Sequence, residues 1–533
     1  MTREEIVQMR LMKAKRARHD VQTTWETCKD YYDGKHRTAL EIADSCRKEG
    51  IPWITAMSPD PYIHVESQIT GDVPDFSFKG REACDEENAK SREAMVRYVL
   101  ETSGYADLAA ASDRRAVIGG TAVWKVFWDG EEVRVADIDP SCIFPDPAAK
   151  RIEDCEYLLY CYPMQRSLFA RLYRDALSGT DLDPDTMPAD PFAVFPDGGY
   201  PDDADTLVLT EHWYKTDDGE IALAVYAGGK YIRGTDRYWE NTRFACYPFV
   251  FRYWLSDADS IWGRGDLEPI LTLVDAVDRE LASGQLASAF SGNDVILAEH
   301  DAFSIPPSNR PGAIWELKPG AMGKVARLGG RQDGAQRLAM IESLRGLIQE
   351  AVGNFDVDMG RTPANIMSAS GLAQLIERSE LRKATKKAER LGAFRRLLGL
   401  IDRTALEFYD RRREFFIGAG TTNAHMACCD PSLLRGRDGY FPAVDTIIST
   451  SDGMRTSRAF LVSAIDTLMG HTIDGVNYPL AGKALELAGL DDAGRIAEHF
   501  KNLFGEEVTT DHDAYDASCG GDPQRLQRTG ADA

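Results

Sequence analysis

The sequence lacks any long uninterrupted hydrophobic run, and no window approaches the roughly 18–20 apolar residues of a membrane span. The first residues, Met1-Thr2-Arg3-Glu4-Glu5, lack the basic and then apolar order of a signal peptide. Ten cysteines are spread over 533 residues without a C-x-x-C pair, and a chain of this length needs no disulfides to fold. These absences predict a protein with reduced thiols that is not embedded in a membrane.

Positive charge is also scarce. The chain has 62 Lys and Arg against 85 Asp and Glu, which gives a net charge of −23. Such a balance argues against a general nucleic-acid-coating protein, because those proteins are normally basic. It remains compatible with a protein that nucleic acid slides past, because an acidic surface makes few firm phosphate contacts.

Signatures of catalysis and metal binding are missing as well. Neither a G-x-x-x-x-G-K-[ST] loop nor a G-x-S-x-G elbow occurs, and the nine histidines lack metal-binding spacing. The acidic pair Asp356/Asp358 could hold Mg²⁺, but solvated carboxylates are commoner in so acidic a chain. The string Arg264-Gly265-Asp266 is expected to cap a helix start rather than to act as an adhesion signal. We therefore expect no enzymatic activity, no cofactor and no metal site.

Hydrophobic periodicity predicts an α+β fold that is predominantly helical. A helix is expected to end at Asp33-Gly34, and Asp129-Gly130 is expected to turn a β-hairpin. An acidic stretch rich in Pro and Gly, residues 178–205, is expected to be a surface insertion. Further helices are expected over residues 86–101, 107–118, 164–177, 266–290, 335–352, 456–469 and 480–504. Strands are expected over residues 121–128, 131–138, 157–162, 207–214, 221–227, 230–233, 294–299, 313–317 and 445–450.

The most informative stretch is a Gly/Pro/Ser-rich loop, Met359–Ser370, followed by a proline-free helical pattern over residues 371–413. The predicted helix would be about 50–60 Å long, and it carries twelve basic against six acidic residues. The spacing of four residues puts its basic side chains on shared faces. One face is formed by Arg382, Lys386 and Arg390, and another by Lys383 and Lys387. The favoured interpretation is a solvated or intersubunit face paired with acidic neighbours, and the alternative is direct DNA contact.

Several strings, in their order, resemble the portal protein (head–tail connector) family of tailed double-stranded DNA bacteriophages. They are Ile261-Trp262-Gly263-Arg264-Gly265-Asp266-Leu267-Glu268-Pro269-Ile270, Pro311-Gly312-Ala313-Ile314-Trp315, Ala369-Ser370-Gly371-Leu372-Ala373, and Asp139-Pro140 with Phe144-Pro145-Asp146-Pro147. The resemblance implies a portal-like wing, stem, clip and crown architecture with two stem helices, a small α/β clip insert, a tunnel loop and a long helix. The implied divisions are an N-terminal wing (1–260), a first stem helix (261–290), a clip (291–332), a second stem helix (333–358), a tunnel loop (359–370), a long helix with the remaining wing (371–455), a helical crown (456–508) and a disordered tail (509–533).

The resemblance also implies a function. Portal proteins form a ring, usually of twelve subunits, at one capsid vertex, through which double-stranded DNA passes during packaging and ejection. Expected partners are further copies of the chain, DNA without sequence specificity, the terminase large subunit, the major capsid protein with scaffold, and a head–tail adaptor. Expected locations are the virion and, during assembly, the host cytoplasm. Candidate residues are Arg361, Asn365, Ser368 and Ser370 for the DNA channel, and Pro311, Gly312 and Trp315 for motor docking on the clip.

Two other functions stay open at this point. One is a Mg²⁺-dependent nuclease or other DNA-processing enzyme that uses Asp356 or Asp358. The other is a capsid or adaptor scaffold without a DNA channel.

Overall fold

The computed structural model divides the chain into two compact units, a larger one of residues 1–73 and 102–409 and a smaller one of residues 74–101 and 410–533. It describes residues 1–48, 57–69, 73–82, 85–178, 182–195, 205–242, 244–292, 295–305, 316–328, 334–353, 369–418, 425–430, 434 and 441–448.

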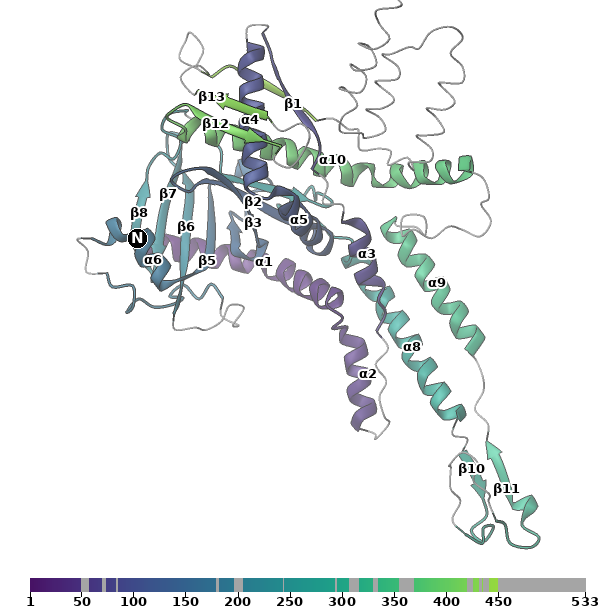
Figure 1. Ribbon diagram of the computed structural model, residues 1–533. Coiled ribbons are helices and arrows are strands. Elements are labelled where there is room, and N and C mark those ends of the chain that lie inside the picture. The colour runs from purple at the N-terminus through teal and green to yellow at the C-terminus, as the bar shows by residue number, and fades with distance from the viewer. Residues whose placement is uncertain are drawn as a thin grey trace, which may run out of the picture. The chain divides into compact units, whose positions relative to one another are not determined.

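The larger unit contains two antiparallel sheets of more than two strands (Figure 1). The three-stranded sheet has the order β3 (Val133–Ile138), β2 (Thr121–Trp128) and β9 (Phe249–Tyr253). The five-stranded sheet has the order β4 (Ile143–Pro145), β5 (Tyr157–Gln165), β6 (Thr206–Lys215), β7 (Ile221–Ala227) and β8 (Lys230–Thr235). The predicted hairpin across Asp129-Gly130 is confirmed, while β4 and β9 were not predicted. Four of the five residues of β9 are buried, so its sequence shows no polar alternation.

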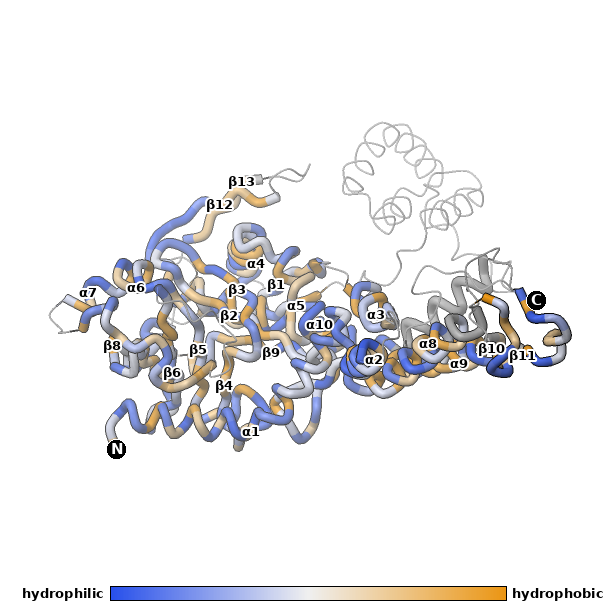
Figure 2. The backbone as a smooth tube through the Cα atoms, turned by 90° about the horizontal axis from the view of Figure 1, so that it is seen from below, coloured by the Kyte–Doolittle hydropathy of each residue, from blue (hydrophilic) through white to orange (hydrophobic). Residues whose placement is uncertain are grey.

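The helices of the larger unit follow the predicted periodicity closely. Helix α1 (Arg3–Tyr32) begins with a capping box between Thr2 and Glu5, and its chain turns away at Gly34, whose φ is 72°. Hydrophilic and hydrophobic residues alternate along its whole length (Figure 2). The remaining helices near the sheets are α2 (Arg37–Lys48), α3 (Asp60–Gln68), α5 (Tyr105–Gly119), α6 (Arg166–Leu172) and α7 (Arg174–Leu177). Helices α2 and α3 were not predicted, and the helix expected over 164–177 is two short helices after a longer β5.

Helices α8 (Leu271–Gly292) and α9 (Gly334–Val352) lie side by side (Figure 1). A 3₁₀ turn, Glu268–Ile270, precedes α8, with Pro269 where a missing N–H does no harm. Between the two helices, β10 (Val295–Ala298) pairs antiparallel with β11 (Val325–Leu328). Strand β11 was missed, and the strand expected over 313–317 lies mostly outside the described residues. Helix α10 (Ala369–Phe408) confirms the long helix, although it ends five residues before the predicted Arg413.

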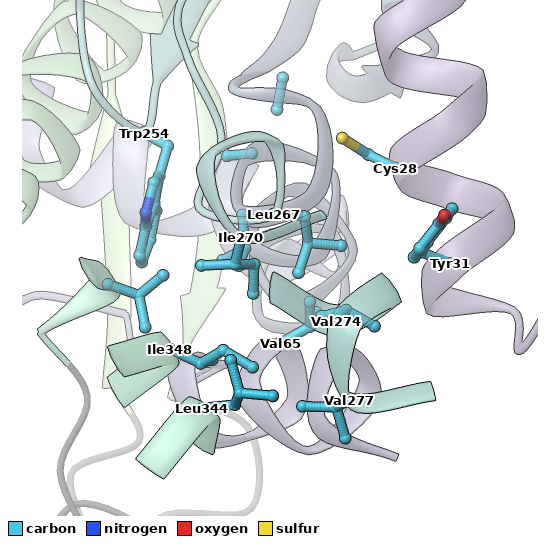
Figure 3. Packing of buried hydrophobic residues seen from close by; sticks show 14 of the residues in the cluster. Cys28, Tyr31, Val65, Trp254, Leu267, Ile270, Val274, Val277, Leu344 and Ile348 are labelled. Carbon is cyan, nitrogen blue, oxygen red and sulfur yellow. The ribbon is translucent and has the colours of Figure 1, made fainter. Parts of the chain in front are cut away.

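One apolar cluster joins α8 and α9 to the helices beside the sheets. Leu267, Ile270, Val274 and Val277 form the buried stripe of the α8 segment. They meet Val65 of α3, and Ile341, Leu344, Ile348 and Val352 of α9 (Figure 3). Cys28 and Tyr31 of α1 and Trp254 belong to the same cluster, as do Ala116, Val117 and Ala122. The periodicity of both helices is therefore explained by one shared core.

The smaller unit combines segments that are far apart in the sequence. It contains β1 (Phe76–Gly80), α4 (Glu86–Thr102, whose last residue belongs to the larger unit), β12 (Arg413–Ile417), β13 (His425–Cys429) and β14 (Val444–Ile448). Strand β1 pairs with β14, and β12 pairs with β13. Arg97 of α4 lies over the Phe76 ring, which is 4.5 Å away, and it pairs with Asp75 and Glu93. The helices expected over 456–469 and 480–504 lie outside the described residues.

The acidic stretch 178–205 differs from the expected surface insertion where it is described. Met187 and Val194 are buried against the five-stranded sheet. The Pro and Gly content suggested an exposed loop, but spaced apolar residues between the acidic ones pack onto the strands. These two side chains belong to the core of the larger unit, while the other described residues of the stretch are exposed or half-buried.

A glycine-lined contact fixes where the α8 segment leaves the sheets. Gly120, with φ of 84°, ends α5, and a Cβ at this residue would lie 2.3 Å from the carbonyl oxygen of Gly263. A Cβ on Gly263 would lie 2.5 Å from the carbonyl oxygen of Gly120. The backbones can approach this closely only because both residues lack side chains.

Replacement of Gly120 by alanine is expected to lower the free energy of unfolding by about 3 kcal/mol, because the new methyl group meets backbone in a left-handed conformation. Chemical denaturation followed by circular dichroism would measure this. Gly34→Ala is the matched control, since Gly34 also has a positive φ, 72°, but a Cβ at this residue would meet nothing within 4 Å; its cost should be about 1 kcal/mol. Equal costs for the two variants would contradict the account of the contact.

Candidate functional site

The candidate site lies where α8, α9 and α10 come together in the larger unit. Its centre is Asp266, which is buried just before the α8 segment. The Asp266 carboxylate accepts hydrogen bonds from Lys386 of α10 at 2.7 Å and from His64 of α3 at 3.1 Å. Its backbone N–H donates to Val117 at the end of α5, at 2.9 Å. One residue therefore connects three helices to the start of a fourth.

Lys386 extends this connection to α9. Its ammonium group donates to the carbonyl oxygen of Val352, the last residue of α9, at 3.1 Å. It also lies 5.2 Å from the ring centre of Trp254, close enough for a cation–π contact. The side chain is mostly buried, so its charge is satisfied within the same chain.

The protonation of Asp266 follows from these partners. Burial on its own would raise the pKa of Asp266, but the hydrogen bond from His64 and the charge of Lys386 outweigh it. The pKa of Asp266 is therefore held below its ordinary value, and the residue is a carboxylate at neutral pH.

The expected capping role of Asp266 is wrong. The 3₁₀ turn that follows has Leu267 at its N-cap position, without a side-chain cap. The Asp266 carboxylate is turned inward to Lys386 and His64 instead, while the exposed Arg264 pairs with Asp257 at 2.9 Å. In the Arg-Gly-Asp string, Arg264 is therefore a surface residue and Asp266 is a buried one.

The structure places the predicted basic helix residues in different surroundings. Lys386 is bound to Asp266, and Arg390 lies 3.7 Å from the buried carboxylate of Asp113. Lys383 and Lys387 are half-buried on the same helix. The side chain of Arg382 lies outside the described residues.

The other predicted site residues fall largely outside the described ranges. These are Arg361, Asn365 and Ser368 of the loop, and Pro311, Gly312 and Trp315 of the region between β10 and β11. Ser370 lies in the first turn of α10, and its side chain is not among those described. Asp356 and Asp358 also fall outside these ranges.

A feature that sequence analysis missed is the exposure of apolar side chains on α9. Leu338, Met340 and Leu347 are 63%, 49% and 51% exposed. Periodicity over residues 335–352 predicts that Leu338 lies in one stripe with Ile341, Leu344 and Ile348, but of these four only the last three are buried. The signal was available in the spacing, because Met340 and Leu347 fall outside a single narrow stripe.

Two other kinds of site are absent from the described residues. Among them, no group of three or more His, Cys, Asp and Glu side chains is arranged to hold a metal ion. In the same part of the chain, no helix combines the length and the apolar character that crossing a bilayer requires.

Comparison with known proteins gives one informative result. The family model of the phage P22-like portal protein matches residues 14–245. The match supports the identification of the chain as a phage portal protein. A search of curated proteins found no match.

Portal proteins are structural components of the phage capsid, at the head–tail connection, that take part in DNA packaging. The matched range begins within α1 and ends after β8, so it contains the whole five-stranded sheet and two strands of the three-stranded one. The cluster around Asp266 and the helices α8 to α10 follow the matched range along the chain.

Replacement of Lys386 by methionine is expected to lower the free energy of unfolding by about 3 kcal/mol, because Asp266 stays buried with an uncompensated charge. Thermal and chemical unfolding would measure the loss. The matched control is Lys150→Met, since Lys150 and its partner Asp259 are both exposed, and this variant should cost less than about 0.5 kcal/mol. If Lys386→Met had the stability of the unchanged protein, the claim that the Lys386–Asp266 contact holds the helices together would be contradicted.

Proposed function

We propose that this portal protein assembles into a closed ring of identical copies and that double-stranded DNA passes through the ring during packaging and ejection. The family match supports the portal assignment. The observation that carries the ring is the pattern of exposed apolar side chains on α9.

The exposed residues of α9 lie on both sides of its buried stripe. At about 100° per residue, Met340 and Leu347 fall on one side of the stripe formed by Ile341, Leu344 and Ile348, and Leu338 falls on the other side. A heterologous ring needs two different contact surfaces on each copy, one for each neighbour. A helix with apolar side chains on both flanks fits this requirement, whereas a two-fold dimer needs only one surface.

A monomer would leave these side chains in water. Single exposed leucines are ordinary in folded proteins, but α9 exposes three large apolar side chains within 19 residues. Their burial by neighbours would stabilise an assembly by about 1.5–3 kcal/mol for each fully covered side chain. The occupant proposed here is therefore a second copy of the same chain on each flank.

The DNA channel and the docking sites are proposed from the resemblance. Channel residues are Arg361, Asn365, Ser368 and Ser370 in the loop before α10, where short polar side chains could meet phosphates without reading bases. Between β10 and β11, motor docking is assigned to Pro311, Gly312 and Trp315. Arg382, Lys383 and Lys387 of α10 are proposed to contact neighbouring copies, with direct DNA contact as the alternative.

The finer architecture belongs to the same proposal. We assign α8 and α9 to the two stem helices, β10 and β11 to the clip, and residues 456–508 to a crown. A ring of twelve copies is the number that the resemblance favours. The terminase large subunit, the major capsid protein with its scaffold, and a head–tail adaptor are the proposed partners, in the virion and during assembly in the host cytoplasm.

Charged residues on either flank of α9 should prevent ring assembly without unfolding the chain. Leu338→Glu and Leu347→Glu are each expected to shift the protein from a large oligomer to monomers, because a buried, unpaired carboxylate opposes the contact. Mass photometry at micromolar concentration would measure the distribution. Leu172→Glu, at a 56% exposed position on α6, is the control and should leave the oligomer intact. Large oligomers in both α9 variants would contradict the proposed contact surfaces.

Shortening the loop between Arg361 and Ser370 should impair DNA filling of capsids while leaving ring assembly intact, because the loop is assigned to the channel and not to contacts between copies. Packaged DNA per particle and ring formation by electron microscopy would be compared with the full-length chain. Normal filling would remove the loop from the proposed channel, and would favour a scaffold without a DNA channel.

A further inference from the structure

A second buried carboxylate, Asp278 of α8, pairs with a buried histidine from another part of the chain. The Nδ1 atom of His36 lies 2.6 Å from Oδ2 of Asp278, and both side chains are almost completely buried. The other oxygen of Asp278 accepts the backbone N–H of Ser58 at 2.7 Å. His36 directly precedes α2, so the pair connects the start of α2 to the middle of α8.

The hydrogen bonds of His36 show how many protons the pair holds. Its Nε2 atom lies 3.0 Å from the carbonyl oxygen of Tyr31, which can only accept, so Nε2 carries a proton. The short contact between Nδ1 and the carboxylate requires another proton, because two acceptors would repel each other there. When one proton leaves, the neutral imidazole has a single N–H, so one of its two contacts, to the Asp278 carboxylate or to the Tyr31 carbonyl, becomes repulsive.

The groups around the pair favour this proton. Asp275 of α8 accepts the Tyr31 hydroxyl at 2.6 Å, and the Tyr31 ring stacks on His36. Asp60 of α3 is bonded to the Ser58 hydroxyl and to Arg345 of α9. The nearest charges to the imidazole are therefore the carboxylates of Asp275 and Asp278, which favour a cation between them.

A second histidine shows the opposite arrangement. His212 lies 2.7 Å from the guanidinium of Arg10, which can only donate. Burial and the charge of Arg10 lower the pKa of His212 to about 3, so it stays neutral. The contrast shows that partners, not burial alone, decide the charge of a histidine in this protein.

One small apolar cluster of described residues also joins α2 to α8. The apolar contact consists of the buried Cys46 and Ala282 with the partly buried Ile42 and Leu286. This cluster is small beside the core that joins α8 to α9. Loss of either contact of His36 would therefore weaken the attachment of α2 at its start.

We propose that the second proton of the His36–Asp278 pair holds the start of α2 between Tyr31 of α1 and Asp278 of α8 as a latch, and that α2 detaches from α8 more readily when alkaline conditions remove this proton. All residues of the latch lie in the larger unit of a single chain. The proposal therefore does not depend on the proposed ring or on DNA. Its consequence is a pH-dependent uncovering of one side of α8, with Cys46 as the residue that becomes accessible.

The direction of the pH effect follows from the linkage between protonation and stability. Burial on its own would lower the pKa of His36, but its hydrogen bond to Asp278 and the charge of that carboxylate outweigh burial and raise the pKa above the ordinary value. A raised pKa in the folded state means that the stabilisation is complete below about pH 6.5. It is lost as the pH rises through the raised value.

The test measures how fast a thiol reagent modifies Cys46 relative to Cys428 in the full chain, from about pH 6 to about pH 10. Cys46 is buried and Cys428 is exposed, so the ratio of their modification in peptide mass mapping reports the detachment of α2. Cys155 and Cys161, which are fully buried, must stay unmodified as evidence that the fold is intact. We expect the ratio to be low near pH 6 and to rise by about tenfold or more toward pH 10, since local opening sets the rate.

Two variants separate the latch from a general effect of pH. His36→Gln should give a high ratio at every pH, and the control His19→Gln, at an exposed position on α1, should follow the unchanged protein. A Cys46 to Cys428 ratio that does not change with pH in the unchanged protein would overturn the proposal. It would also be overturned if the ratio rose with pH in His36→Gln as much as in the unchanged protein. If His36→Gln does not fold, the dependence of the ratio on pH in the unchanged protein still tests the proposal.

Discussion

Two buried carboxylates on one segment, Asp266 and Asp278, constrain how the larger unit is put together. A carboxylate removed from water is tolerated only when a cation or several hydrogen-bond donors meet it. Asp266 meets Lys386 and His64, and Asp278 meets His36 and the Ser58 backbone. These partners come from segments before and after α8 in the chain, so the position of α8 depends on both. The apolar core around Val274 and Leu344 then fills the space that these contacts define.

Much of the local structure could be predicted, because it depends on neighbours in the sequence. The end of α1 at Asp33-Gly34, the hairpin at Asp129-Gly130 and the long α10 all follow from turn residues and periodicity. Strand β1 could not be predicted in this way, since its partner β14 lies more than 360 residues later. Its five residues, Phe76–Gly80, gain their strand structure from that distant pairing.

In the candidate site, too, local features could be predicted from the sequence and contacts between distant residues could not. The spacing of Lys386 and Arg390 correctly placed them on one helix, but four-residue spacing is equally typical of an exposed basic face. Only the tertiary contact with Asp266, 120 residues earlier, shows that Lys386 is satisfied within the chain. The exposure of Leu338 was likewise decided by which helix faces α9, and no pattern within residues 334–352 determines that. The family match ends at residue 245, so the proposed ring depends on these later helices for its physical argument.

The central claim is that identical copies cover both flanks of α9 in a closed ring. The most direct measurement is a cryo-electron microscopy map of the purified full-length protein at side-chain resolution. The account predicts a ring in which Leu338 of one copy and Leu347 of the same copy are each covered by a different neighbour. A monomer, or a ring in which either side chain faces solvent, would contradict it.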